Sequence, residues 1–339
     1  MNTALVVTTI LPPTEPLRRW AAACTERNIR FWVIGDRKTP TDFRLEGAHF
    51  IGLPEQQKLD FQLARRLPEN HYARKNLGYL TAIREGVQHI LETDDDNFPL
   101  PAFWRSEALA SKARTVSLHA TPADGWLNVY QHFSDRPVWP RGFPPTLAHR
   151  PLPSTTDLAS WQAPIRQGLA NHCPDADAIY HLAYPEPLYF REAAPFFVGK
   201  GQWCPFNSQA TSWERAVFPL LYLPSYAPFR LTDIWRSLIA QRVLWEHESG
   251  VLFLPPTVHH ERNPHDLLAD LEEEHLGYRQ HLPMSQALSQ LPLRGTMTNQ
   301  LCQCYEDFVR RGWLPKAELA LLEYWLRDIE NTGWRSSGC

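Results

Sequence analysis

The chain opens with Ala4-Leu-Val-Val-Thr-Thr-Ile10, an apolar, β-branched run that Pro12 and Pro13 end. This pattern predicts a buried strand that leads into a loop. Residues 15–27 follow with helical spacing of apolar side chains, and residues 30–34 and 48–53 again have strand composition. A β-α-β opening predicts a mostly parallel sheet with ligands at the carboxyl ends of its strands. We therefore expect an α/β fold of Rossmann-like type.

A cluster of carboxylates, Thr93-Asp94-Asp95-Asp96-Asn97, follows the short apolar run at residues 89–91. Like charges repel, so three at a strand end favour a bound cation. In extended geometry Asp94 and Asp96 point to one side, about 6.6 Å apart, and Asp95 points to the other. Oxygen ligands favour Mg²⁺ or Mn²⁺. The alternative is a solvated acidic turn, since Asn97 and Pro99 are typical turn residues.

Basic side chains begin the next predicted helix, which spans residues 72–88. Arg74 and Lys75 lie in its first turn, where cations oppose the helix dipole. A bound phosphate would resolve that conflict, whereas the alternative is a solvated basic turn. Gly78 leaves room for close backbone approach.

Two later segments carry further candidates. Residues 201–209 form a rigid, aromatic, amide-rich loop that is typical of sugar sites, although buried structural aromatics are the alternative. A helix is expected from about 231 to 247, and Asp233 at its start either caps the helix or faces the cleft as a base. His259 and His260 follow a strand at 252–254 and point to opposite faces, so at most one completes a metal shell, and we assign His259.

Composition narrows the class of protein. The chain has 339 residues, of which 43% are hydrophobic and 21% charged, and its formal charge of −3 disfavours nucleic acid as the main partner. No window approaches 18 apolar residues and the N-terminus lacks a basic region, so we expect no integral membrane segment and a cytoplasmic protein. We expect a domain at 1–285 and a C-terminal helical appendage at 286–339, with helices at 299–311 and 316–328.

Six segments lie in order and at plausible spacing over roughly residues 3–280. They are Val33–Pro40, Arg74–Leu80, Glu92–Asn97, Trp203–Gln209, Phe229–Arg236 and Pro256–His259. Taken together, these segments resemble the STELLO glycosyltransferase-like family and, more distantly, the plant reversibly glycosylated polypeptides (UDP-arabinopyranose mutases).

This resemblance implies a GT-A fold that binds a nucleotide-sugar and a divalent metal, Mn²⁺ or Mg²⁺, through an Asp-x-Asp element. Asp94 would contact the ribose or the metal, and Asp96 would ligate the metal through the diphosphate. The other residues implied in nucleotide-sugar binding are Thr9 and Asp36 at the nucleoside, Arg74 and Lys75 at the phosphates, and Lys38, Asn76, Trp203, Asn207 and Arg236. In an inverting enzyme Asp233 would be the base; in a retaining one it would position the substrate.

We therefore predict a metal-dependent glycosyltransferase that moves a sugar from a nucleotide-diphosphate-sugar, with UDP as the implied nucleotide, to a glycan or glycoconjugate. A nucleotide-sugar mutase or self-glycosylating protein is the second hypothesis, and a non-catalytic interaction scaffold is the third. A dinucleotide-dependent oxidoreductase is disfavoured, because no Gly-x-Gly-x-x-Gly follows the first strand. The sequence leaves the oligomeric state open.

Overall fold

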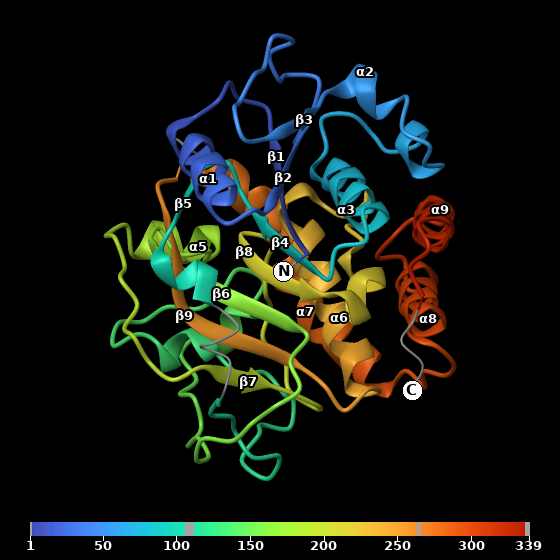
Figure 1. The fold of residues 1–339 in the computed structure, drawn as a ribbon. Coiled ribbons are helices and arrows are strands. Elements are labelled where there is room, and N and C mark those ends of the chain that lie inside the picture. Colours follow the sequence, from blue (N-terminus) through green and yellow to red (C-terminus); the bar gives the residue numbers. More distant parts are fainter. Residues whose placement is uncertain (1, 106–111, 263–265, 336–339) are drawn as a thin grey trace.

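A computed structural model describes residues 2–105, 112–262 and 266–335. The chain is organised around one sheet, in which the strand order is β3-β2-β1-β4-β8-β6-β9-β5 and β7 pairs with β9 (Figure 1). The strands are β1 (Thr3–Thr9), β2 (Arg30–Gly35), β3 (His49–Ile51), β4 (His89–Thr93), β5 (Asn97–Pro99), β6 (Ile165–His172), β7 (Phe196–Val198), β8 (Ala210–Glu214) and β9 (Val251–His260).

The two halves of this sheet differ in strand direction. Strands β3, β2, β1 and β4 are all parallel, as the β-α-β opening predicts. In the other half β8 is antiparallel to β4 and β6, whereas β6 and β9 are parallel. The α/β class is confirmed, but the sheet as a whole is mixed rather than mostly parallel.

Helices cover both faces of the parallel half. Side chains alternate along a strand, so the apolar residues of β1 point to both faces of the sheet. On β1, Leu5 and Val7 pack in a cluster with α1 (Glu15–Glu26), whereas Ala4 and Val6 pack in a cluster with α3 (Lys75–Arg84). The near-continuous apolar run of β1 therefore reflects burial on two sides.

Gly78 lets α3 approach the sheet closely. A Cβ atom there would lie 2.4 Å from Cγ1 of Val6 and 2.9 Å from Cγ1 of Ile34. Since real Cβ atoms do not come so near, a larger residue would push α3 away from β1 and β2. The expected role of this glycine is confirmed.

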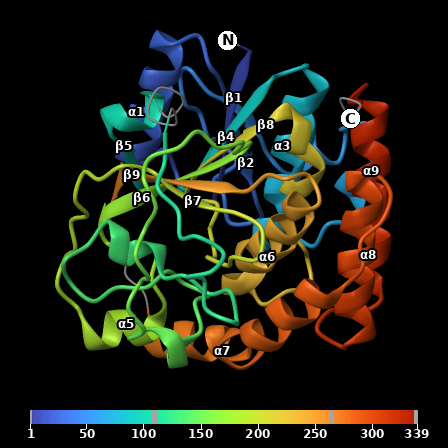
Figure 2. The ribbon, with the colours of Figure 1, turned by 90° about the horizontal axis from the view of Figure 1, so that it is seen from below.

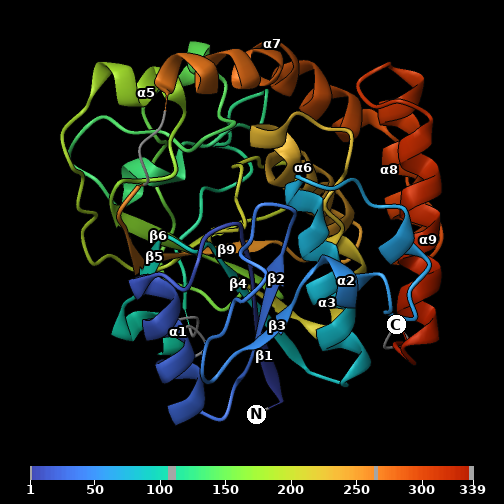
Figure 3. The same ribbon diagram turned by 90° about the horizontal axis from the view of Figure 1, so that it is seen from above.

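Of the remaining helices, α2 follows β3 in the parallel half, and α5 to α9 come after β6 in the chain. In Figures 2 and 3, α7 runs along one edge of the molecule, from α5 to the paired helices α8 and α9. Their bounds are α2 (Leu53–Gln56), α5 (Ala178–Ala183), α6 (Thr232–Trp245), α7 (Leu267–Gln290), α8 (Met297–Arg310) and α9 (Ala317–Asn331).

The two predicted C-terminal helices correspond to α8 and α9. They share one hydrophobic cluster with α3 and α6, and α7 runs through the predicted boundary at 285/286. The division into two domains stays a prediction. Within the described parts of the chain, no helix has the length and apolar character needed to cross a bilayer.

Candidate functional site

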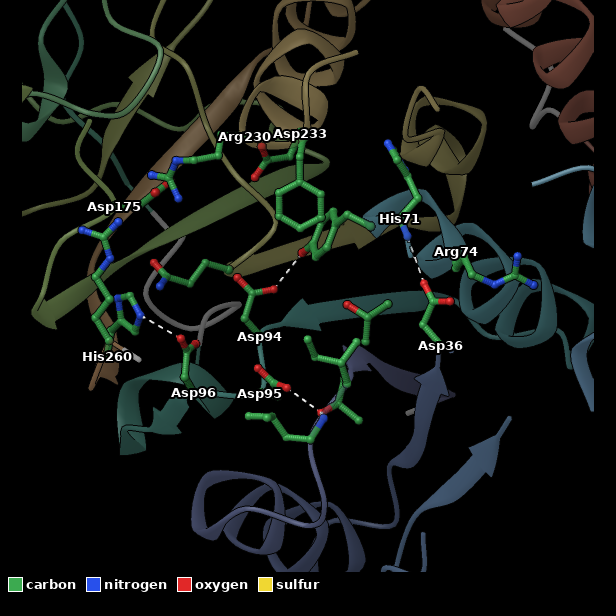
Figure 4. A pocket seen from close by; sticks show the side chains of 18 of the residues that line it. Asp36, His71, Arg74, Asp94, Asp95, Asp96, Asp175, Arg230, Asp233 and His260 are labelled. Carbon is green, nitrogen blue, oxygen red and sulfur yellow. Dashed lines mark hydrogen bonds and ion pairs between the residues drawn. The ribbon is translucent and has the colours of Figure 1, made fainter. Parts of the chain in front are cut away.

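A cavity of about 710 Å³ opens at the carboxyl ends of the parallel strands (Figure 4). Its volume lies in the range of small-molecule sites. Thr9, Asp36 and Asp94, which end or follow β1, β2 and β4, all line it, as the strand pattern predicts. The wall also includes Lys38, His71, Tyr72, Arg74, Asp95, Asp96, Arg141, Cys173, Asp175, His181, Gln209, Phe229, Arg230, Asp233, His260 and Arg262.

The three carboxylates lie in a turn between β4 and β5, so the expectation of an extended segment is wrong. In this turn they point to three different partners, and all of them line the cavity. Asp94 accepts a hydrogen bond from the Tyr72 hydroxyl at 2.7 Å and lies 3.4 Å from the Lys75 ammonium. Asp95 accepts from the Thr9 hydroxyl. Thr9 therefore orients the acidic cluster directly.

Burial and mutual repulsion act on this cluster. Burial, with a contribution from Asp96, raises the pKa of Asp94, although Lys75 opposes the shift. Burial likewise raises the pKa of Asp95 to about 6, and the charges of Asp96 and Asp94 add to it. A cation placed between these groups would offset both effects.

A histidine pairs with the third carboxylate, but it is not the predicted one. His260 Nε2 lies 3.2 Å from Asp96 Oδ2, and its Nδ1 lies 2.8 Å from the Cys173 carbonyl oxygen. His259 points to the other face of β9, where it lies near His172 and outside the cavity wall. The structure thus corrects the assignment of His259, because alternation along the strand turns its neighbour inward. Burial opposes the charging of His260, but its bonds to Asp96 and Cys173 raise its pKa to about 10.

The donor set fits a divalent metal only in part. Among the described residues, no group of three or more His, Cys, Asp or Glu side chains is assembled around one point. Mg²⁺ and Mn²⁺ are often held by one or two carboxylates together with substrate phosphates and water. Asp94 and Asp96 supply carboxylates of this kind at the cavity wall, so the residues fit a metal that arrives with a diphosphate.

The far wall of the cavity is built around Asp36. Its carboxylate accepts hydrogen bonds from the backbone N–H groups of Asn70 and His71, both at 2.9 Å. It therefore fixes the loop that precedes α3, while Lys38 lies exposed on the same wall. The structure brings both predicted residues to the cavity.

The two predicted phosphate cations are already engaged. The Arg74 guanidinium bonds the Gln56 side chain and the carbonyl groups of Leu67 and Pro68, although Arg74 still lines the cavity. Lys75 is fully buried, with Nζ 2.9 Å from the Thr93 carbonyl oxygen. Carbonyl groups and Asp94 thus offset these charges, where we expected a bound anion to do so.

Besides Lys75, four predicted ligand contacts lie outside the cavity wall. Asn76 bonds both backbone groups of Leu223 at 2.9 Å. Trp203 packs against Trp245, so the structural alternative for this tryptophan holds. The other two are Asn207, which donates to Asp175, and Arg236, which pairs with buried Glu92.

A set of charged residues that the sequence did not suggest surrounds Asp233. The Arg141 guanidinium bonds both oxygens of Asp233, at 3.0 and 2.9 Å, and both oxygens of Asp175, at 2.8 and 3.1 Å. Ser208 donates to Asp233 through N–H and hydroxyl, both at 3.2 Å. Arg141 and Asp175 lie in irregular segments, where no periodic pattern marks them.

These contacts determine the protonation state of Asp233. Burial alone would raise its pKa, but the charge and hydrogen bonds of Arg141 hold the pKa below its ordinary value. The carboxylate stays ionised, and its oxygens already accept several hydrogen bonds. It is a weak proton acceptor, so the geometry disfavours the role of base.

The parallel half, the mixed half and the acidic turn at their junction together form a mixed α/β fold. The family model "STELLO glycosyltransferases" matches residues 230–338. Probable glycosyltransferase STELLO2 from Arabidopsis thaliana is 31% identical over 276 residues, which cover 75% of this chain and 35% of the relative. Probable glycosyltransferase STELLO1 from the same plant is 30% identical over the same length.

The resemblance to the STELLO glycosyltransferases is thereby confirmed, although the chain spans about a third of the length of these relatives. Among solved structures, glucosyl-3-phosphoglycerate synthase from Mycobacterium tuberculosis is similar to the chain at a TM-score of 0.40 and 12% identity, over 89% of this chain and 80% of that one.

Proposed function

We propose that the protein is a metal-dependent glycosyltransferase that uses a nucleotide-diphosphate-sugar and transfers its sugar to a glycan or glycoconjugate. The observation that carries the proposal is the acidic turn, whose three carboxylates line the same cavity as the ends of β1 and β2. The STELLO resemblance supports the reaction class and makes UDP-sugars the first donors to test.

Different residues around the cavity would have different roles in binding the substrate. Asp94 and Asp96 would hold the metal, which supplies positive charge against the diphosphate leaving group. Thr9 and Lys75 keep Asp95 and Asp94 oriented, and Asp36 shapes the nucleoside wall through its bonds to the backbone of residues 70 and 71.

We assign Asp233 a positioning role in place of proton abstraction. Together with Asp175 and the Arg230 carbonyl group, it engages all five N–H donors of the Arg141 guanidinium and so fixes this part of the cavity wall. Cytoplasmic location stays a prediction from the sequence.

The test is turnover with a panel of nucleotide-sugars, with and without Mn²⁺, in which nucleoside diphosphate release and sugar isomerisation are both followed. We expect metal-dependent release that Asp96→Asn abolishes. The control is Asp135→Asn, which removes an exposed carboxylate paired with Arg191 on the surface. Isomerisation without release would indicate a mutase instead, and failure to bind any nucleotide-sugar would favour an interaction scaffold.

A further inference from the structure

Beneath the cavity lies a second set of polar side chains that water does not reach. The carboxylate of Glu92 accepts hydrogen bonds from Trp213 at 2.8 Å, from Arg236 at 2.8 and 3.2 Å, and from the Tyr79 hydroxyl. All four residues are at most 1% exposed. The Arg236 guanidinium also lies 4.8 Å over the Trp213 ring. We refer to these four residues as the buried network.

Members of the buried network lie on the same secondary-structure elements as residues near the cavity. Two of its members lie three or four positions along a helix from a residue near the cavity, which puts both on one face of that helix. The pairs are Tyr79 and Lys75 on α3, and Arg236 and Asp233 on α6, while Glu92 lies on β4 two positions before Asp94.

Hydrogen bonds also join the residues at and next to the cavity to one another. Tyr72 Oη lies 2.7 Å from Asp94 and 2.6 Å from the hydroxyl of Ser208, which in turn lies 3.2 Å from Asp233. Lys75 connects Asp94 to the Ser208 carbonyl, at 3.1 Å. These hydrogen bonds therefore run without a break from the acidic turn to Asp233.

Stability alone is a weak reason to bury such a network. Removing a carboxylate and a guanidinium from water is costly, and apolar residues of similar volume often replace a buried ion pair with no loss of stability. Hydrogen bonds fix the distance and the angle between the elements that they join, and apolar contacts do not.

We propose that the buried network is a positioning device, which fixes the acidic turn against α3 and α6 so that metal and diphosphate meet a preformed site. This inference rests on the proposed function, and it assigns Glu92, Tyr79, Trp213 and Arg236 a role in ligand binding without contact to the ligand. Arg236, which the resemblance implied as a ligand contact, acts instead through Glu92.

The test replaces the central ion pair by apolar residues in the double variant Glu92→Leu/Arg236→Met. We expect a folded protein with a lower melting temperature, because the buried Tyr79 hydroxyl and Trp213 N–H lose the acceptor that they share. Hydrogen exchange in peptides that cover residues 93–97 should rise about tenfold in the ligand-free protein. Affinity for UDP with Mn²⁺, measured by calorimetry, should fall about tenfold or more.

A matched control lies on the same helix, farther from the cavity. Arg242→Met/Glu246→Leu removes a partly buried ion pair near the other end of α6 and should leave both readouts at wild-type values. If the double variant of the buried network does not fold, Arg236→Lys decides, because it keeps the charge but loses the two-pronged hydrogen bond. Faster hydrogen exchange at residues 93–97 and weaker binding of UDP with Mn²⁺ in the folded Arg236→Lys variant would support the proposal.

Wild-type exchange at residues 93–97 and wild-type affinity in a folded variant would overturn the proposal. Failure of the proposed function is a separate outcome. If the wild-type protein binds no nucleoside diphosphate with Mn²⁺, that function is contradicted, whereas hydrogen exchange in the ligand-free protein still decides whether the network positions the turn.

Discussion

At the scale of single residues, the neighbours of Asp233 define its chemistry more than its place at a helix start does. Arg141, Ser208 and the backbone N–H of Ile234 all donate to its carboxylate. A carboxylate held in this way keeps its charge and orients its donors. The site therefore uses it to hold Arg141 in place.

Asp233→Asn should lower turnover on the order of 100-fold, because Arg141 loses one of its two charged partners and the cavity wall shifts. The shape of the pH–rate profile should not change. Asp124→Asn is the control, since Asp124 makes a similar two-pronged pair with Arg150 away from the cavity. Disappearance of the acid limb of kcat/KM in Asp233→Asn would instead identify Asp233 as the base.

His281 illustrates a buried group whose ionisation affects stability. Its Nδ1 lies 2.7 Å from the Gly142 carbonyl oxygen, and its Nε2 accepts from the Trp235 indole N–H at 3.2 Å. Both ring nitrogens are thus used by the neutral form. Burial, with help from the Arg141 charge, lowers its pKa to about 4.

The unfolded chain, with an ordinary histidine pKa of about 6.5, binds this proton first as the pH falls. Stability from His281 is therefore complete above pH 6.5 and is lost between about pH 6.5 and 4, by about 3 kcal/mol in all. Urea unfolding at pH 7 and pH 5 measures about 2 kcal/mol of this loss, and His281→Gln should reduce it. An unchanged pH dependence in that variant would contradict the assignment.

At the scale of elements, Asn76 on α3 bridges to the segment that precedes α6. Its amide donates to the Leu223 carbonyl and accepts from the Leu223 N–H, all within the buried core. The side chain supplies hydrogen bonds to backbone groups that have no partner in a strand. It thereby joins α3 to the segment between β8 and α6.

Asn76→Ala should destabilise the protein on the order of 3 kcal/mol, because it leaves two buried backbone groups without partners. Affinity of the folded fraction for UDP with Mn²⁺ should stay at the wild-type value. Denaturant unfolding and calorimetry check the two statements. A large loss of affinity with unchanged stability would restore Asn76 as a ligand contact.

The elements also show how far the sequence predicts the site. The parallel half could be predicted because its strands are continuous apolar runs with helices between them, so Thr9, Asp36 and Asp94 were placed correctly. The second half was not, because β7 has three residues and β8 five, and both pair antiparallel with strands distant in sequence. Such short strands carry no periodic signal.

Residues brought together by tertiary contacts alone were missed for the same reason. Arg141 meets Asp233 across 92 positions, and His260 meets Asp96 across 164. Arg236 and Asn76 were assigned to the ligand because their segments resemble a family, but resemblance does not say whether a side chain faces a cavity or the core.

At the scale of the whole molecule, the C-terminal helix α9 is attached to two segments, one that precedes α3 and one that precedes α6. The Glu318 carboxylate accepts from the Tyr222 hydroxyl and from the N–H of Tyr226 at 2.8 Å. Asp328 accepts from the N–H groups of Gln62 and Leu63, at 2.9 and 2.8 Å. These bonds, with the shared core, make α9 part of the scaffold around the cavity.

A chain that ends at residue 290 should therefore lose cooperative unfolding and nucleotide binding, since it exposes apolar surface that α8 and α9 cover. Circular dichroism with a thermal scan measures this directly. A truncated chain that unfolds cooperatively and binds UDP with Mn²⁺ like the full chain would instead support a separable appendage at 286–339.

The central claim is that the acidic turn binds a metal together with a nucleoside diphosphate. Calorimetric titration of nucleoside diphosphates, UDP first, into the full chain with Mn²⁺ or with a chelator tests it most directly. We predict saturable binding that requires Mn²⁺ and that Asp96→Asn weakens about 100-fold or more, in line with the loss of several kcal/mol of charge stabilisation. Equal binding with Mn²⁺ and chelator, or no binding of any nucleoside diphosphate, would contradict the account.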